Sequence, residues 1–105
     1  MNFRCPELLA LARDQPCSNC GRNDGTTVAA HSNWHDKGAG MKASDQFSCW
    51  LCFVCHRFLD QGGSGLDPTG RYHATRDDKK RMFLAAMEKT LSELWEQGLV
   101  GVIKR

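Results

Sequence analysis

The feature of this chain that most restricts its fold is a pair of C-x-x-C units, Cys17-x2-Cys20 and Cys52-x2-Cys55, separated by 31 residues. In each unit, two thiolates from one tight turn can occupy adjacent corners of a tetrahedron, the geometry that Zn²⁺ adopts in structural sites. The gap is longer than in the simplest zinc ribbon, so it must hold structure of its own. The spacing therefore predicts a four-cysteine zinc site built around an intervening structural unit.

The N-terminal segment bears on the choice between metal and disulfide. Its apolar run, residues 8–12, is short and is flanked by Glu7 and Arg13, which is not the pattern of a secretory signal. No later stretch approaches the roughly 20 apolar residues that span a bilayer. The sequence thus indicates a cytoplasmic protein without membrane contact, in which six cysteines stay reduced and can bind metal.

Two other metal centres stay open on the cysteine pattern. Cys52-x2-Cys55-His56 has the C-x-x-C-H form of a haem attachment site, although covalent haem attachment is normally made outside the cytoplasm. Cys49-x2-Cys52-x2-Cys55 has the triple spacing of iron-sulfur ligation, but without the usual fourth cysteine and proline. Zinc is favoured over both, and Cys5 and Cys49 are interpreted as small buried or spare residues.

The chain is interpreted as a single domain of residues 1–105 with a metal core over about 17–62. Residues 26–35 and 47–51 favour extended structure and are expected to pair as a hairpin. A short helix is expected to follow from about Cys52 and to end at Gly62-Gly63. The predicted fold class is α+β, a small zinc-stabilised treble clef of zinc knuckle, β-hairpin and short helix, packed with a long C-terminal helix.

The flanking segments carry weaker signals. A short helix is expected at 6–13, a flexible connector over 62–72, and a short strand over 99–103. Thr75 with Asp78 predicts the N-terminus of the long helix, at about 76–97, with Gly98 as its stop.

One face of the long helix is predicted to be core, because its apolar residues recur at helical spacing. These residues are Phe83, Ala86, Met87, Leu91, Leu94 and Trp95. The basic start of the helix, Lys79-Lys80-Arg81, is interpreted as a solvated surface.

Two histidines and a carboxylate are candidates for chemistry. His31 falls on the first predicted strand, while His56 follows Cys55 directly. On a helix, His56 and Asp60 are four residues apart, so their side chains lie one above the other and could chelate a divalent ion. A histidine on the hairpin opposite this pair is the arrangement of a one-metal nuclease.

These residues resemble the HNH, or ββα-metal, endonucleases with a four-cysteine zinc site, most closely the small YbcO-like nucleases of lambdoid prophages. The resemblance covers Cys17 to Asp60. It rests on the two cysteine pairs, on Ala30-His31, on the loop GAGMKASD from Gly38 to Asp45, and on His56 with Asp60 behind it.

The resemblance implies hydrolysis of DNA phosphodiester bonds, with His31 as general base and a divalent ion such as Mg²⁺ on His56. Ala30 stands where many members have a metal ligand. Asp60 is the candidate substitute, and His35 and Asp36 are weaker ones. Asp45, nearest the place of the family's middle asparagine, is expected to brace the loop or to bind metal.

The charge pattern does not indicate a strongly nucleic-acid-binding protein, because the formal net charge is only +2. Lys37 and Lys42 with the glycines between them could approach a phosphate, and Arg57 could touch the strand. No base-reading helix is evident, so little sequence specificity is expected. The alternative function is a zinc-stabilised module that binds nucleic acid or protein without catalysis.

Overall fold

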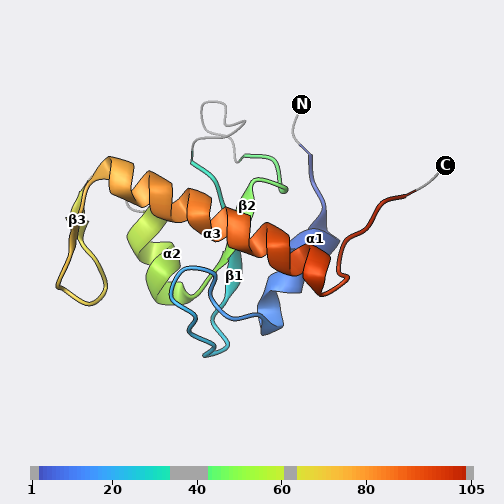
Figure 1. Cartoon of the computed structure of the whole chain (residues 1–105), viewed down its shortest axis with the longest axis horizontal. Helices are drawn as coiled ribbons and strands as arrows, with labels where there is room; N and C mark the ends of the chain where they lie inside the picture. Colours follow the sequence, from blue (N-terminus) through green and yellow to red (C-terminus); the bar gives the residue numbers. More distant parts are fainter. Residues whose placement is uncertain (1–2, 34–42, 61–63, 104–105) are drawn as a thin grey trace.

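The computed structural model describes residues 3–33, 43–60 and 64–103, which form an α+β fold with two small antiparallel sheets and a long C-terminal helix (Figure 1). The elements in chain order are α1 (Pro6–Ala10), the 3-10 helix η1 (Leu11–Asp14), β1 (Val28–His31), β2 (Ser48–Leu51), α2 (Phe53–Asp60), β3 (Gly65–Leu66), β4 (His73–Ala74) and α3 (Arg76–Glu96). None of the helices in these ranges has both the length and the apolar character needed to cross a membrane.

The first helix begins as predicted, with Pro6 in its first turn and Glu7 beside the positive end of the helix dipole. It continues as the 3-10 turn η1, which ends at Asp14, and Gln15 is already extended. The loop that follows carries Cys17 and Cys20.

The predicted hairpin is present but shorter than expected. Strands β1 and β2 pair antiparallel, with Ala30 opposite Cys49 and His31 opposite Ser48. β1 begins at Val28, after Thr26, whose hydroxyl donates to Asp24 and accepts from the backbone N–H of Phe53 at 3.0 Å. The same hydroxyl thus satisfies the first N–H of α2.

The long helix α3 begins and ends where the sequence predicts. Thr75 and Asp78 form a reciprocal capping box, in which each side chain accepts a hydrogen bond from the other residue's backbone N–H. At the C-terminal end, Gly98 has φ of +70°, a conformation that glycine adopts without strain. Both termini are therefore set by local sequence.

The buried face of α3 differs from the predicted one. Leu91 and Trp95 are 56% and 51% exposed, whereas Thr90 is buried. The Thr90 hydroxyl accepts from the backbone N–H of Trp50 at 3.0 Å and lies 2.8 Å from the Ser18 hydroxyl. These hydrogen bonds turn the Thr90 side of the helix toward β2, so the prediction of Leu91 and Trp95 as core was wrong.

Lys79 also differs from the prediction of a solvated basic surface, because its side chain is buried. Its ammonium group lies over the Phe58 ring, 4.7 Å from the ring centre. A cation over an aromatic face retains part of the stabilisation that water would give it. Lys79 therefore joins α3 to α2.

The segment predicted as a flexible connector forms the first strand and the turn of a second hairpin, whose other strand, β4, follows directly after it. Asp67 organises its turn, because one carboxylate oxygen accepts hydrogen bonds from the backbone N–H groups of Arg71 and Tyr72. The predicted strand over 99–103 was wrong, because those residues are not in a strand. The predicted stop at Gly62-Gly63 lies outside the described residues.

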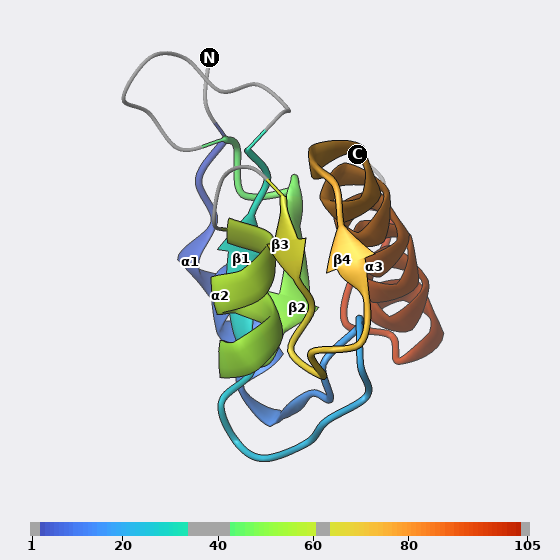
Figure 2. The same ribbon diagram turned by 90° about the vertical axis from the view of Figure 1, so that its left-hand side faces the viewer.

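The main core lies between α2, β2 and α3 (Figure 2). It contains three cysteines of the two C-x-x-C pairs, Cys17, Cys52 and Cys55, packed with Leu51 and Phe83. The apolar core and the cysteine pairs are therefore one structural unit.

Candidate metal centre and active site

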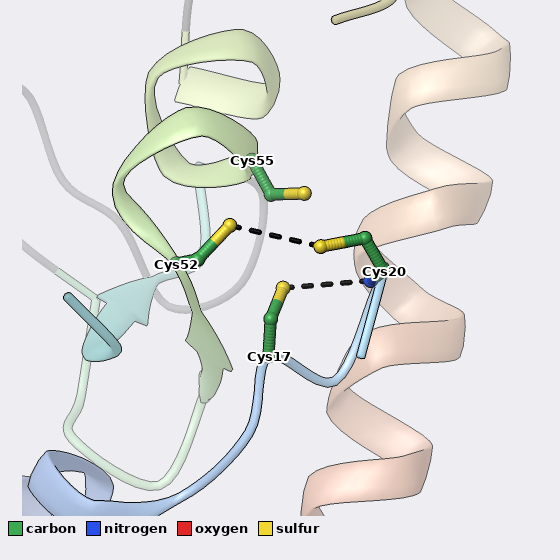
Figure 3. A group of neighbouring side chains, drawn as sticks. All are labelled: Cys17, Cys20, Cys52 and Cys55. Atoms are coloured by element: carbon green, nitrogen blue, oxygen red, sulfur yellow. Dashed lines mark hydrogen bonds between the residues drawn. The ribbon is translucent and has the colours of Figure 1, made fainter. Parts of the chain in front are cut away.

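The four cysteines of the two C-x-x-C units come together, as predicted. Their sulfur atoms all lie within 4.8 Å of one another. Cys17 and Cys20 come from the loop after η1. Cys52 directly precedes α2 and Cys55 lies in its first turn, with all four side chains directed toward a common centre (Figure 3). This group could hold a metal ion.

The donor set fits a tetrahedral thiophilic ion. The Sγ atoms of Cys20 and Cys52 are 3.7 Å apart, and a tetrahedron with Zn–S bonds of 2.3 Å has edges of about 3.8 Å. All four cysteines are free of disulfides. The distance and the thiol chemistry are therefore both compatible with structural zinc.

The cluster already favours a thiolate. A hydrogen bond from the Cys55 thiol is the main cause that lowers the pKa of Cys17 to about 4. The pKa of Cys55 is raised by the same bond, which holds its proton, and burial raises the pKa of Cys20. Cys17 is thus the thiolate of the group, and a bound cation would favour loss of the protons from the other thiols as well.

Asn19 connects the two cysteine pairs. Its backbone N–H donates to the Sγ of Cys17, and its side-chain amide donates to the Sγ of Cys55, each at 3.4 Å. Hydrogen bonds of this kind stabilise negative charge on ligand sulfur. The sequence placed Asn19 inside the first C-x-x-C unit, but its reach to the second pair depends on the tertiary fold.

Replacement of Asn19 by alanine is expected to weaken metal affinity about 10- to 100-fold, because outer hydrogen-bond partners of metal ligands have effects of that size. Competition with a chromophoric chelator measures the affinity. Asn23→Ala is the matched control, since Asn23 is exposed in the same loop. Equal affinities for the two variants would show that the Asn19 amide contributes nothing.

The two remaining cysteines lie outside this group. Cys49 is fully buried in β2, and burial raises the pKa of its thiol. The Cys5 thiol donates to Glu7 at 3.5 Å. Because the sulfur group joins Cys52 and Cys55 to the distant first pair rather than to Cys49, the geometry favours the four-cysteine site over the iron-sulfur triple.

His31 and Asp45 form a hydrogen-bonded pair at the end of β1. Nε2 of His31 lies 2.8 Å from Oδ1 of Asp45, whose side chain is 3% exposed. Burial alone would raise the pKa of Asp45, but hydrogen bonds from His31, Cys5 and Arg4 hold it below its ordinary value. The ionised carboxylate can only accept, so Nε2 of His31 is the donor in this hydrogen bond.

The N-terminal segment holds Asp45 in place. Arg4 contacts Oδ1 of Asp45 at 3.2 Å, and the backbone N–H of Cys5 donates to Oδ2. The backbone N–H of Asp45 in turn donates to the carbonyl of Phe3 at 2.9 Å. Both carboxylate oxygens are thus engaged by protein donors, which favours the bracing role of Asp45 over the metal-binding one.

His56 and Asp60 lie on α2, where His56 is half-buried and Asp60 is exposed. Oδ1 of Asp60 accepts a hydrogen bond from the side chain of Asn33 at 3.3 Å. This bond joins the chain just after β1, the strand that carries His31, to the C-terminal end of α2.

Within residues 3–33, 43–60 and 64–103, the four cysteines are the one group of three or more metal-ligating side chains. His31, His56, Asp45 and Asp60 are therefore not gathered into a second such group. The weaker candidates His35 and Asp36, and the loop Lys37 to Lys42, lie outside the described residues.

No protein-family model, curated protein or solved structure matches this chain. Its function is therefore argued from the arrangement of its own side chains. Two residues of that arrangement had no signal in the sequence, namely Arg4, which contacts Asp45, and Asn33, which contacts Asp60. Both act across more than 20 residues of chain, which local patterns do not reveal.

Proposed function

We propose that this protein is a metal-dependent endonuclease of the HNH type that hydrolyses DNA phosphodiester bonds with little sequence specificity. The observation that carries the proposal is the His31–Asp45 pair, in which a buried carboxylate orients an imidazole at one end of the β1–β2 hairpin, while the other end of β2 leads into the four-cysteine group. Carboxylate-oriented histidines are general bases in many hydrolytic sites. In this proposal the protein acts in the cytoplasm, in DNA processing or recombination of a phage or prophage.

The four-cysteine centre has a structural role in this proposal. It holds Zn²⁺ and fixes the loop, the β1–β2 hairpin and the start of α2 as a treble clef. The supporting observation is that these three segments contribute the ligands, or lie between them, and share one core. A closed four-cysteine site has no open position for substrate, so the chemistry belongs to other residues.

His31 is the general base. Its Nε2 donates to Asp45, and its Nδ1 takes the proton of the attacking water as the new P–O bond forms. The carboxylate also stabilises the imidazolium that results. The leaving group is the 3′ oxygen, so the products carry 5′-phosphate and 3′-hydroxyl ends.

His56 and Asp60 are the proposed ligands of the catalytic divalent ion, Mg²⁺ or a similar metal. Such an ion, when bound, stabilises charge on the scissile phosphate and the leaving oxygen. Mg²⁺ is commonly held by one or two protein side chains, with waters and substrate phosphate completing its shell. A site of two side chains on α2 is therefore sufficient, with Asn33 holding Asp60 by a hydrogen bond.

The zinc-loaded protein is expected to nick supercoiled plasmid DNA when Mg²⁺ or Mn²⁺ is added. A brief treatment with EDTA should stop the cleavage. Agarose gels follow the conversion to relaxed circles, and zinc content is measured after the assay. Asp60→Ala should require a higher Mg²⁺ concentration for half-maximal rate, with zinc content unchanged. A wild-type protein that does not nick contradicts the proposed function, and an unchanged Mg²⁺ dependence removes Asp60 from the site.

The second candidate function is a non-catalytic zinc module that binds nucleic acid or a protein. Ala30, at the position before His31, favours it, because an alanine cannot ligate metal. DNA binding without cleavage under any divalent ion would support this candidate.

A further inference from the structure

A groove lies between α2 and the β3–β4 hairpin. These elements stand side by side in Figure 2. Its volume is about 250 Å³, and it is lined by Phe53, Val54, Arg57, Phe58, Leu66 and Pro68. This volume is below the roughly 300–1,000 Å³ of pockets that enclose drug-sized ligands. The groove therefore suits a single flat ring rather than a larger molecule.

The walls of this groove are apolar and exposed. Phe53 is 60% exposed and Leu66 is 61% exposed, although they are large hydrophobic residues. They come from opposite sides, Phe53 from the first turn of α2 and Leu66 from β3. The buried Phe58 adds a second aromatic ring at the groove. An aromatic ring facing an aliphatic side chain is a common way to sandwich a nucleobase.

Arg57 gives the groove a positive charge. Its side chain is exposed, and the ion pairs among the described residues do not include it. A guanidinium group matches a phosphate in charge and geometry and can also stack on a base. The groove thus combines a stacking surface with a phosphate-binding cation, the two features of a nucleotide site.

The groove adjoins the proposed catalytic surface. Phe53 lies three residues before His56 on the same helix, so these two side chains are neighbours on its surface, and Asp60 lies one turn beyond His56. Arg57 lies four residues after Phe53, on the side of Phe53 away from His56. A strand whose phosphate lies at His56 can therefore place an adjacent base against Phe53.

We propose that this groove binds one unpaired nucleobase next to the scissile phosphate, so that the protein prefers single-stranded or locally unpaired DNA to intact duplex. A paired base cannot enter, because its edge is hydrogen-bonded and both its faces are stacked. The preference for an unpaired base concerns binding, whereas its place beside a scissile phosphate rests on the proposed nuclease function.

The test is fluorescence anisotropy of a labelled single-stranded oligonucleotide and of the same sequence as blunt duplex, without added Mg²⁺ so that no cleavage occurs. Phe53→Ala should weaken single-strand binding about 5- to 100-fold, the range for removal of one base-aromatic stack. Duplex binding should change less than about two-fold, since it lacks that stack. Phe53→Trp should retain single-strand affinity.

Trp95→Ala is the matched control, because Trp95 is an aromatic residue 51% exposed on α3, outside the groove. It should leave both affinities unchanged. Leu66→Ser tests the opposite wall and should reproduce the selective loss. Zinc content and circular dichroism of each variant establish that it is folded.

Three results would overturn the nucleobase site. The first is equal affinity of Phe53→Ala and wild type for the single strand. The second is an equal loss for single strand and duplex. The third is an absence of DNA binding together with binding of an apolar dye that Phe53→Ala removes, which would assign the groove to an apolar partner. A protein that binds single strands through Phe53 but does not cut DNA would refute the nuclease function alone.

Discussion

Removal of the metal from the four-cysteine centre is expected to abolish the cooperative unfolding transition of this protein. Three of its cysteines lie inside the main core, packed against Leu51 and Phe83. Structural zinc contributes about 10–16 kcal/mol to small zinc domains near neutral pH, which equals or exceeds the total stability of about 5–15 kcal/mol of a typical domain. The core of this chain should not persist without the ion.

Circular dichroism during a thermal scan, before and after treatment with a strong zinc chelator, measures the effect. Cys52→Ala should behave like the chelated protein, whereas Cys5→Ala should melt like the wild type, because Cys5 lies outside the sulfur group. Elemental analysis should give one zinc per chain. A metal-free protein that melts cooperatively at an unchanged temperature would show that the centre is dispensable, and a coloured protein would indicate iron or haem instead.

Substitution of His31 by alanine is expected to lower the rate of DNA cleavage about 100- to 10,000-fold, the usual contribution of a general base. The imidazole is the group that Asp45 holds by a 2.8 Å hydrogen bond, and no other histidine of the described residues is ion-paired with a carboxylate. Asp45→Asn should lower the rate by a smaller factor, because an amide can orient the ring but cannot stabilise its positive charge. Plasmid nicking at saturating Mg²⁺ gives both rates.

His73→Ala is the control for this experiment, since His73 is an exposed histidine in β4. It should cut at the wild-type rate. His31→Ala and His73→Ala should keep their zinc and their melting temperature to within a few degrees, and Asp45→Asn should keep its zinc but melt lower, because its amide NH2 faces a protein donor in place of a carboxylate oxygen. If His31→Ala cuts as fast as wild type, His31 is not the base.

The features that the sequence predicted are those specified by neighbouring residues. The capping box of Thr75 with Asp78, the proline at the start of α1 and the glycine after α3 each act within one turn of helix. The four-cysteine group was also predictable, because each C-x-x-C unit has its own geometry and Cys17-x2-Cys20 has a unit of the same kind at Cys52-x2-Cys55.

The features that it did not predict depend on contacts between distant segments. The buried face of α3 is decided by Thr90, whose hydroxyl finds partners 40 and 72 residues away. The contact of the Lys79 ammonium group with the Phe58 ring likewise forms only when α2 and α3 pack together. The β3–β4 hairpin was missed because the glycines and the proline in its segment favour a loop, and its order comes from the carboxylate of Asp67.

In the candidate site, the sequence supplied His31, His56, Asp45 and Asp60 but not the contacts that bind them. The hydrogen bond of His31 to Asp45 joins residues 14 apart, and the contact of Arg4 with Asp45 joins residues 41 apart. Residue type and spacing can identify candidate site residues. The hydrogen-bond partners of these residues are known only once the tertiary fold is known.

The Thr90 hydroxyl has a consequence for how uniquely the long helix is placed. A purely apolar stripe would let α3 rotate about its axis or slip along β2 by a turn, about 5.4 Å, at modest cost. Either movement would leave the Trp50 N–H and the Ser18 hydroxyl, both in the interior, without their shared partner. The buried Thr90 oxygen therefore favours one rotation and one register of α3 against β2. It also fixes the position of the cysteine loop that contains Ser18.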